Sequence, residues 1–208
     1  MKLLLGSNGA FLTDTGFPLL DMEPADFRIG YVLTASKSVD DLSYLERHKE
    51  AMAAAGYTNV EPIDIEGKTA DELREIFADK NVIHVEGGNT FYLLKAIRES
   101  GFEEVVREAL DRGVVYAGTS AGAYVACPTI EMARFGLHKH DEHGVTDLTG
   151  MGLVPFLVKA HYKDEQAEMM REMIKNSSYP VRLLRDGQGI FVNGDEVQFV
   201  GVGDEPIL

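Results

Sequence analysis

The sequence predicts an α/β fold: a doubly wound, mostly parallel sheet with helices on both sides. Over residues 1–120, short apolar segments alternate with segments of helical spacing. Strands that are apolar throughout are typical of a parallel sheet that is buried on both faces. Two glycine-rich turns, at residues 86–90 and 118–122, also follow expected strands. Ligands of such sheets bind beyond the carboxyl ends of the strands, so both turns are expected at one site.

The expected elements can be followed along the chain. Strands are expected at residues 3–5, 28–33, 60–65, 81–85 and 114–117, and helices at residues 40–55, 69–77, 90–99 and 103–111. Thr69 and Glu72 form a capping-box pattern at the start of one helix. Farther on, a helix is expected at 164–175, and short strands at 181–184, 189–193 and 196–202 that extend or flank the sheet. Asn193-Gly194-Asp195 is a hairpin signal. Residues 1–208 are expected to form a single domain.

Composition excludes several classes of function. The 208 residues suffice for one substantial core, and 45% hydrophobic residues are ordinary for a globular protein. The formal net charge of −14 argues against a nucleic acid or an anionic membrane as partner. The single cysteine, Cys127, cannot form an internal disulfide and is expected to be a small buried hydrophobe. Without a membrane span or a signal peptide, a cytoplasmic location is expected.

The segment around Ser120 has the pattern of a nucleophile elbow. Gly118 and Gly122 stand two residues before and after the serine, between a strand of β-forming residues and a second apolar run. Small neighbours are needed because a sharp strand-to-helix turn crowds the side chains beside the exposed one. The amide of Ala121 then lies at a helix N-terminus, where it favours developing negative charge. A glycine-rich turn with an incidental serine is the alternative interpretation.

A second oxyanion donor is expected at Gly88. The segment Gly87-Gly88-Asn89-Thr90-Phe91 lies between an expected strand and an expected helix. Because glycine has no side chain, the Gly88 amide can approach a reacting carbonyl oxygen closely. The alternative is a plain turn in which Asn89 or Thr90 caps the helix. Capping does not use the Gly88 amide, so both interpretations can hold.

Among the six histidines, His161 is the candidate general base for Ser120. It follows the apolar run at residues 153–158, so it is expected at the end of a strand, over the site. A surface histidine is the alternative. His48 lies in a charged helix and is expected to be solvated, whereas His84 lies in an apolar strand and is expected to be packed with its hydrogen bonds satisfied.

Three histidines and Asp141 lie close together in residues 138–143. They could bind a divalent metal ion, but their spacing matches no familiar zinc pattern. A solvated loop is therefore the preferred interpretation, and no metal is expected. The carboxylate that would orient His161 is left open among Asp141, Glu142 and Glu131.

Four segments resemble the peptidase E family of serine peptidases, which includes aspartyl dipeptidases and cyanophycinases. They are Gly87-Gly88-Asn89-Thr90-Phe91 continued by Leu93-Leu94, Gly118-Thr119-Ser120-Ala121-Gly122-Ala123, Cys127-Pro128-Thr129-Ile130, and His161-Tyr162. The resemblance covers most of the chain and is strongest from residue 81 to residue 162. It implies a class I glutamine amidotransferase-like (flavodoxin-like) three-layer sandwich, with serine where the amidotransferases have cysteine.

The resemblance also implies a role for each matching residue. The nucleophile, the histidine and the two oxyanion donors of the family match, in that order, Ser120, His161, Gly88 and Ala121. The aspartate that follows Pro-Thr-Ile in the dipeptidases is Phe135 here. Because this chain carries extra residues between the serine and the histidine, the acid is expected to have moved to Asp141. No cofactor or metal is required.

The expected function is hydrolysis of small peptides by a dipeptidase-like serine peptidase that forms an acyl-enzyme. Aspartyl dipeptidases have an arginine-bearing segment after the histidine, and the mostly acidic residues 163–168 stand there instead. A preference for N-terminal aspartate is therefore open, and a free amine or a basic side chain could be favoured. The alternatives are an amidase or esterase on a small non-peptide substrate, a non-catalytic binding module, and a metal protein built on residues 138–143. The fold family also suggests a homodimer.

Overall fold

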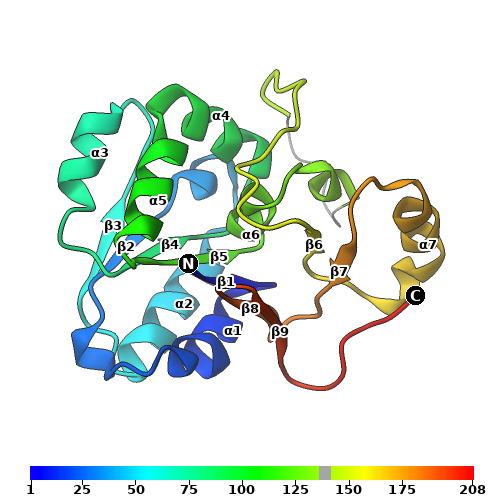
Figure 1. Cartoon of the computed structure of the whole chain (residues 1–208), viewed down its shortest axis with the longest axis horizontal. Helices are drawn as coiled ribbons and strands as arrows, with labels where there is room; N and C mark the ends of the chain where they lie inside the picture. The colour runs from blue at the N-terminus through cyan, green and yellow to red at the C-terminus, as the bar shows by residue number, and fades with distance from the viewer. Residues whose placement is uncertain (136–141) are drawn as a thin grey trace.

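A computed structural model describes residues 1–135 and 142–208 of the chain, which fold around a seven-stranded sheet (Figure 1). The strand order is β3-β2-β4-β5-β1-β8-β9. The first five in that order are parallel, whereas β8 runs antiparallel to β1 and to β9. The strands are β1 (Lys2–Gly6), β2 (Ile29–Val32), β3 (Val60–Ile63), β4 (Val82–Val85), β5 (Val115–Thr119), β8 (Gln188–Asn193) and β9 (Glu196–Gly201). The sheet is mostly parallel, as expected.

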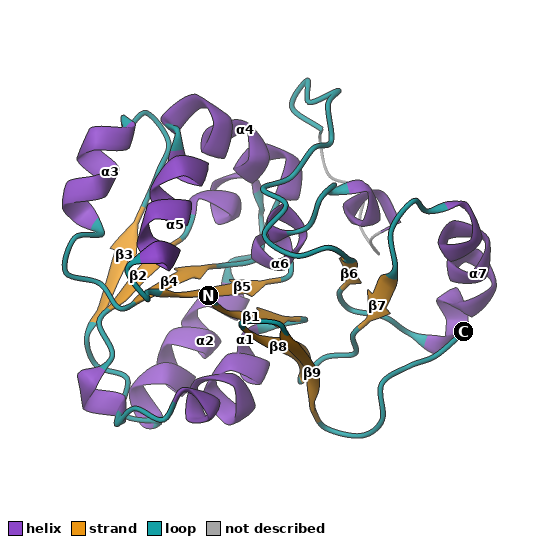
Figure 2. Ribbon diagram, viewed as in Figure 1, coloured by secondary structure: helices purple, strands orange, loops and turns teal. Residues whose placement is uncertain are grey.

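Helices cover both faces of this sheet (Figure 2). One face carries α1 (Gly9–Phe11) and α2 (Ser43–Ala54), and the other carries α3 (Ala70–Ile76), α4 (Thr90–Ser100) and α5 (Phe102–Asp111). The capping box at Thr69 is present, and α4 ends at Gly101, whose φ of 69° suits a residue without a side chain. Each expected strand and helix of residues 28–120 is confirmed within a few residues at its ends.

Two stretches differ from a simple alternation of strands and helices. Residues 9–27, for which no element was expected, form α1 and short π and 3₁₀ turns at Leu12–Gly16, Phe17–Leu20 and Pro24–Asp26. Beyond β5, the chain forms α6 (Ala121–Ala126), a separate two-stranded parallel sheet of β6 (Leu157–Lys159) and β7 (Val181–Leu183), and α7 (Ala167–Asn176). The β8–β9 hairpin then extends the main sheet, as expected for the tail.

The core lies on both faces of the sheet. In β1, Leu3 and Leu5 pack into one hydrophobic cluster with residues of α4, α5 and α6, while Leu4 packs into a second cluster with Phe11 and Phe17. All three leucines are fully buried, and burial of each stabilises the fold by about 1.5–3 kcal/mol. This is why β2, β4 and β5 are buried along their whole length rather than on alternate residues, whereas the edge strands β3 and β9 are partly exposed. In the described part of the chain, no helix is both long and apolar enough to cross a membrane.

The pairing register brings several strand ends to one edge. Gly6 pairs with Thr119 of β5 and with Gly189 of β8, and Val85 of β4 pairs with Gly118. The carboxyl ends of β1, β4 and β5 therefore meet the amino end of β8. Both glycine-rich turns leave the sheet at this edge, as expected for turns that follow neighbouring parallel strands.

Candidate active site

Ser120 sits in a strained turn between β5 and α6. Its φ of 48° and ψ of −104° are unusual for a residue with a side chain, and its amide donates to the Gly6 carbonyl at 3.0 Å. Gly122 is needed because a Cβ there would lie 2.0 Å from the Val85 carbonyl oxygen. At Gly118 a Cβ would lie 2.4 Å from the Gly122 oxygen. The two glycines thus let β4, β5 and α6 approach closely around the serine.

His161 lies beside this serine, as expected. It follows β6, and its Nε2 atom is 3.1 Å from the Ser120 Oγ. The His161 backbone has a φ of 53° and is held by a 2.8 Å hydrogen bond from its amide to the Ser7 Oγ. Ser7 directly follows β1, so the end of a core strand fixes the position of the histidine. The distance suits proton transfer from the serine hydroxyl.

Asp186 is the carboxylate that contacts this histidine. Its Oδ1 lies 2.6 Å from His161 Nδ1 and accepts a 3.0 Å hydrogen bond from the Ser7 hydroxyl. The hydrogen bond with His161 holds the pKa of Asp186 below its usual range. Asp186 lies in the turn between β7 and β8, after the histidine in the chain. Asp186 was not considered from the sequence as a candidate for the carboxylate. The Asp186-Gly187 pair, a turn signal just before an expected strand, is the pattern that could have indicated it.

The carboxylates considered from the sequence lie elsewhere or outside the described residues. Asp141 lies outside the described residues. Glu142 accepts from Arg134 at 2.9 and 3.0 Å. Glu131 accepts from the Ser177 hydroxyl at 3.3 Å. Neither glutamate has a contact with His161 in the described part of the chain.

The two expected oxyanion donors flank the serine. Ala121 is the first residue of α6, so its amide has no acceptor within the helix. Gly88 has a φ of 144°, and a Cβ there would lie 2.3 Å from the Ala35 carbonyl oxygen, so only glycine fits. Asn89 caps α4 by accepting from the Phe91 and Tyr92 amides, which leaves the Gly88 amide out of the cap. Gly87 packs against the serine, since a Cβ there would lie 3.2 Å from the Ser120 Cβ.

A cavity of about 660 Å³ opens beside Ser120 and His161. Its size suits a small organic ligand or a dipeptide. Three cationic residues line it, Arg47, Lys159 and Lys163, and so do three acids, Asp14, Glu86 and Asp186. Of the acidic segment at 163–168, only Lys163 belongs to the lining. The hypothesis that this segment favours a basic substrate required its acidic side chains to face the cavity, and they do not line it.

Four other expectations from the sequence can be compared with the structure. The prediction for His48 was wrong: its side chain is only 5% exposed, and its Nδ1 lies 2.5 Å from Glu86 Oε2. His84 is buried as expected, although its Nδ1 atom has no partner among the described residues. Cys127 is a buried free thiol, and burial raises its pKa to about 12. In the 138–143 segment, the described His143 places its Nε2 2.8 Å from the Ser38 Oγ.

Comparison with known proteins gives concordant results. The model of peptidase family S51 matches residues 3–200. Peptidase E of Streptomyces coelicolor is 30% identical over 229 residues, covering 98% of this chain and 86% of that protein. The probable alpha-aspartyl dipeptidase of Drosophila melanogaster is 31% identical over 176 residues, covering 78% and 68%. The crystal structure of a candidate peptidase E protein from Listeria monocytogenes matches with a TM-score of 0.84 and 24% identity, covering 97% and 98%.

Proposed function

This chain belongs to peptidase family S51 and is a serine-type peptidase; we propose that Ser120, His161 and Asp186 are its catalytic triad and that it hydrolyses dipeptides. The observation that carries the proposal is the continuous contact from the serine hydroxyl through His161 to Asp186, at 3.1 and 2.6 Å. A nucleophile, a base and a group that orients the base are recognised by this geometry rather than by their order in the chain.

The proposed mechanism uses these groups in two steps. His161 accepts the Ser120 proton as the serine oxygen attacks the peptide carbonyl carbon, and the Gly88 and Ala121 amides stabilise the oxyanion. His161 then donates the proton to the leaving amine, and the acyl-enzyme forms. Water, deprotonated by His161, attacks the ester and releases Ser120. Asp186 keeps His161 in the tautomer whose Nε2 faces the serine.

The lining of the cavity supports substrates that carry a carboxylate. Lys159 is fully buried and donates to the adjacent Ala160 carbonyl at 2.6 Å, and no carboxylate in the described residues lies within ion-pair distance of it. A buried ammonium that has no carboxylate partner is stabilised by an anionic ligand, because burying an unpaired charge is costly. Arg47 and Lys163 add positive charge at the rim. The name of the Drosophila relative agrees with an acidic residue in the substrate.

The test is hydrolysis of a dipeptide panel in which the N-terminal residue is acidic, neutral or basic and the C-terminal residue is constant. Cleavage with kcat/KM highest for an acidic residue supports both the reaction and the specificity. Cleavage with equal rates for all residues supports the reaction and contradicts the specificity. If the folded protein cleaves no dipeptide but hydrolyses small amides or esters, the dipeptidase proposal fails in favour of an amidase or esterase.

The remaining expectations stay proposals. A homodimer and a cytoplasmic location are two of them, and the net charge of −14 supports a third, the absence of nucleic-acid and anionic-membrane partners. Light scattering after size exclusion tests the dimer: twice the mass of 22.9 kDa supports it, and the monomer mass contradicts it.

A further inference from the structure

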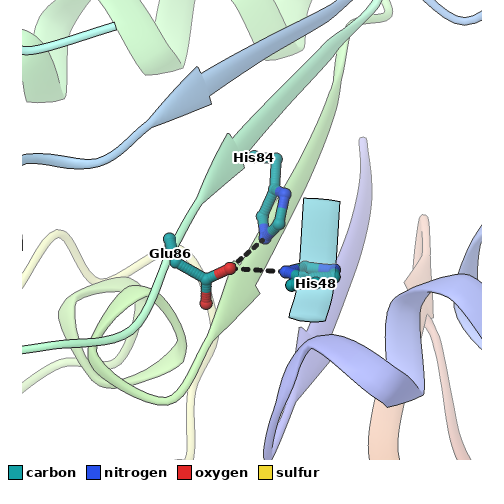
Figure 3. Close-up of side chains that lie close together, drawn as sticks. All are labelled: His48, His84 and Glu86. Atoms are coloured by element: carbon teal, nitrogen blue, oxygen red, sulfur yellow. Dashed lines mark hydrogen bonds and ion pairs between the residues drawn. The ribbon is translucent and has the colours of Figure 1, made fainter. Parts of the chain in front are cut away.

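A second polar cluster lies behind the nucleophile, around the buried side chain of Glu86. His48 from α2 and His84 from β4 both point toward one oxygen of this carboxylate (Figure 3). The Glu86 side chain is 4% exposed and directly follows β4. The proposed triad does not include it, although a buried charge is costly unless several donors compensate it.

Four donors surround the two oxygens of Glu86. Its Oε2 accepts from the Tyr31 hydroxyl at 2.5 Å and lies 2.5 Å from His48 Nδ1. Its Oε1 accepts from the Gly87 amide at 2.7 Å and from the Thr119 hydroxyl at 2.6 Å. A carboxylate can accept about four hydrogen bonds, so none is left for a substrate. Burial favours the neutral acid, but the His48 contact and nearby His84 outweigh it and hold the pKa of Glu86 below its usual range.

The donors on Oε1 belong to the two turns that carry the oxyanion donors. Gly87 directly precedes Gly88, and Thr119 directly precedes Ser120 and Ala121. One oxygen atom therefore connects the end of β4 with the end of β5. The other oxygen connects the same point to β2 through Tyr31 and to α2 through His48. The position of the Glu86 carboxylate therefore couples the turn that carries the Gly88 amide to the turn that carries the Ala121 amide.

The same cluster could be considered as a metal site, because ligand atoms of His48, His84 and Glu86 lie within 4.8 Å of one another. Nitrogen and oxygen ligands lie about 2.0–2.2 Å from zinc, so two of them around one tetrahedral ion are about 3.3 Å apart. The 2.5 Å separation of His48 Nδ1 from Glu86 Oε2 is a hydrogen-bond distance instead. The geometry is that of a hydrogen-bonded network.

We propose that Glu86 is a positioning residue of the peptidase, which holds the Gly88 and Ala121 amides at the separation that the oxyanion requires. This inference rests on the proposed oxyanion donors. Glu86 lines the cavity, but the partners of both its oxygens are protein groups, so it acts through the Gly87 amide and the Thr119 hydroxyl. Its loss should therefore weaken binding of the tetrahedral transition state and leave ground-state binding of the peptide almost unchanged.

Two variants test this proposal. Glu86→Gln keeps the shape but replaces one oxygen by an amide donor, so it can no longer serve all four donors. Thr119→Val removes only the hydroxyl that contacts Oε1. We expect kcat to fall about 10- to 100-fold in Glu86→Gln and about 3- to 10-fold in Thr119→Val, with KM within about threefold, since loss of one whole oxyanion donor costs about 10²–10³ in kcat.

The matched control is Thr34→Val, which makes the same chemical change at a buried threonine that donates to the Asp64 carboxylate at 2.9 Å. It should lower stability at least as much, because it removes a hydrogen bond to a carboxylate and the 2.9 Å bond that the Thr34 hydroxyl accepts from the Ile65 amide. It should keep kcat within about twofold, because the Asp64 carboxylate has no hydrogen bond with either oxyanion turn in the described residues. A peptide boronic acid forms a tetrahedral adduct with the serine. Its affinity should fall in proportion to kcat in Glu86→Gln and Thr119→Val, and should not fall in Thr34→Val.

Several results would overturn the proposal. One is a folded Glu86→Gln or Thr119→Val enzyme whose kcat and boronate affinity stay within twofold of wild type. Another is a loss confined to KM, and a third is an equal loss of kcat in Thr34→Val. If the Glu86→Gln protein does not fold, the kcat and boronate affinity of Thr119→Val alone test the proposal. If wild type cleaves no dipeptide, the proposed substrate is wrong, and the rate at which a phosphonate ester labels Ser120 replaces kcat as the measure.

Discussion

Two histidine–carboxylate pairs lie close to the nucleophile, and their surroundings differ. In the first pair, His161 is 39% and Asp186 is 61% exposed, and the two atoms in contact are 2.6 Å apart. In the second pair, His48 is 5% and Glu86 is 4% exposed, and the corresponding separation is 2.5 Å. The distances are nearly equal, so distance alone does not distinguish a catalytic pair from a structural one.

The two pairs are distinguished by the groups that surround them. His161 presents its second ring nitrogen to the Ser120 hydroxyl at the cavity, where substrate and water can arrive. The second ring nitrogen of His48 is buried and has no partner among the described residues. Its carboxylate is occupied by four donors. The exposed pair is therefore suited to exchange protons with a reacting group, whereas the buried pair, whose carboxylate is occupied by protein donors, is suited to hold the neighbouring backbone in place.

The largest expected effect comes from removing the hydroxyl on which the exposed pair acts. Ser120→Ala should lower kcat by about 10⁴- to 10⁶-fold with little change in stability, since the nucleophile and its base act as a unit. Dipeptide hydrolysis and thermal unfolding of the same preparation measure both quantities. Residual activity above about 1% of wild type would show that another residue is the nucleophile.

The next largest effect should separate Asp186 from the carboxylates considered from the sequence. Asp186→Asn should lower kcat by about 10²- to 10⁴-fold, because the histidine loses the group that sets its tautomer. Glu131→Gln, which changes a carboxylate paired with Ser177, is the control and should stay within about twofold. A large loss in Asp141→Asn together with none in Asp186→Asn would assign the role to Asp141 instead.

A smaller effect, on KM, is expected from Lys159, the buried cation of the cavity that has no carboxylate partner among the described residues. Burial lowers the pKa of Lys159 to about 8, so its ammonium is charged below that pH and neutral above it. For an acidic dipeptide, KM should rise about 3- to 10-fold from pH 7 to pH 9, the size expected when a charge-assisted hydrogen bond becomes a neutral one. Lys159→Met should show the high KM at both pH values. The same pH profile in wild type and variant would contradict the role of Lys159.

The last effect concerns His84, which lies beside the buried pair, and is a dependence of stability rather than of turnover on pH. Burial lowers the pKa of His84 to about 3, whereas an unfolded histidine titrates near 6.5. Between these values the unfolded state binds the extra proton, so the free energy of unfolding falls as the pH falls from about 6.5 to 3, by at most about 1.4 kcal/mol per pH unit for this group. Urea unfolding of His84→Leu should show a shallower slope; an unchanged slope would contradict this assignment.

The pattern of the sequence predicted most of the parallel sheet. Apolar strands, the capping box at Thr69 and the glycine after α4 each reflect local physics, and the structure contains all of them. The glycines at 118 and 122 also predicted the elbow, because close backbone approach leaves no alternative to glycine. Residues 9–27 lacked a periodic pattern, and their short turns depend on aromatic packing among Phe17, Phe27 and Tyr57.

The site was predicted less completely because part of it depends on contacts between distant strands. Asp186 lies next to His161 because β8 pairs antiparallel with β1. No pattern within residues 181–193 indicates that β1 is the strand with which β8 pairs. His48 was expected in solvent because residues beside it in α2 are charged. Its burial depends on Glu86, 38 residues away, which offers a partner that the helix sequence does not show.

The central claim is that Ser120, activated by His161, attacks the peptide carbonyl. The most direct measurement is covalent labelling with a peptide phosphonate diphenyl ester, followed by mass spectrometry of the intact protein and of its proteolytic fragments. We predict one adduct per chain, located on Ser120, which protects against dipeptide hydrolysis in proportion to its yield and does not form in Ser120→Ala. An active enzyme whose adduct lies on another residue, or whose activity survives full labelling of Ser120, would contradict the claim.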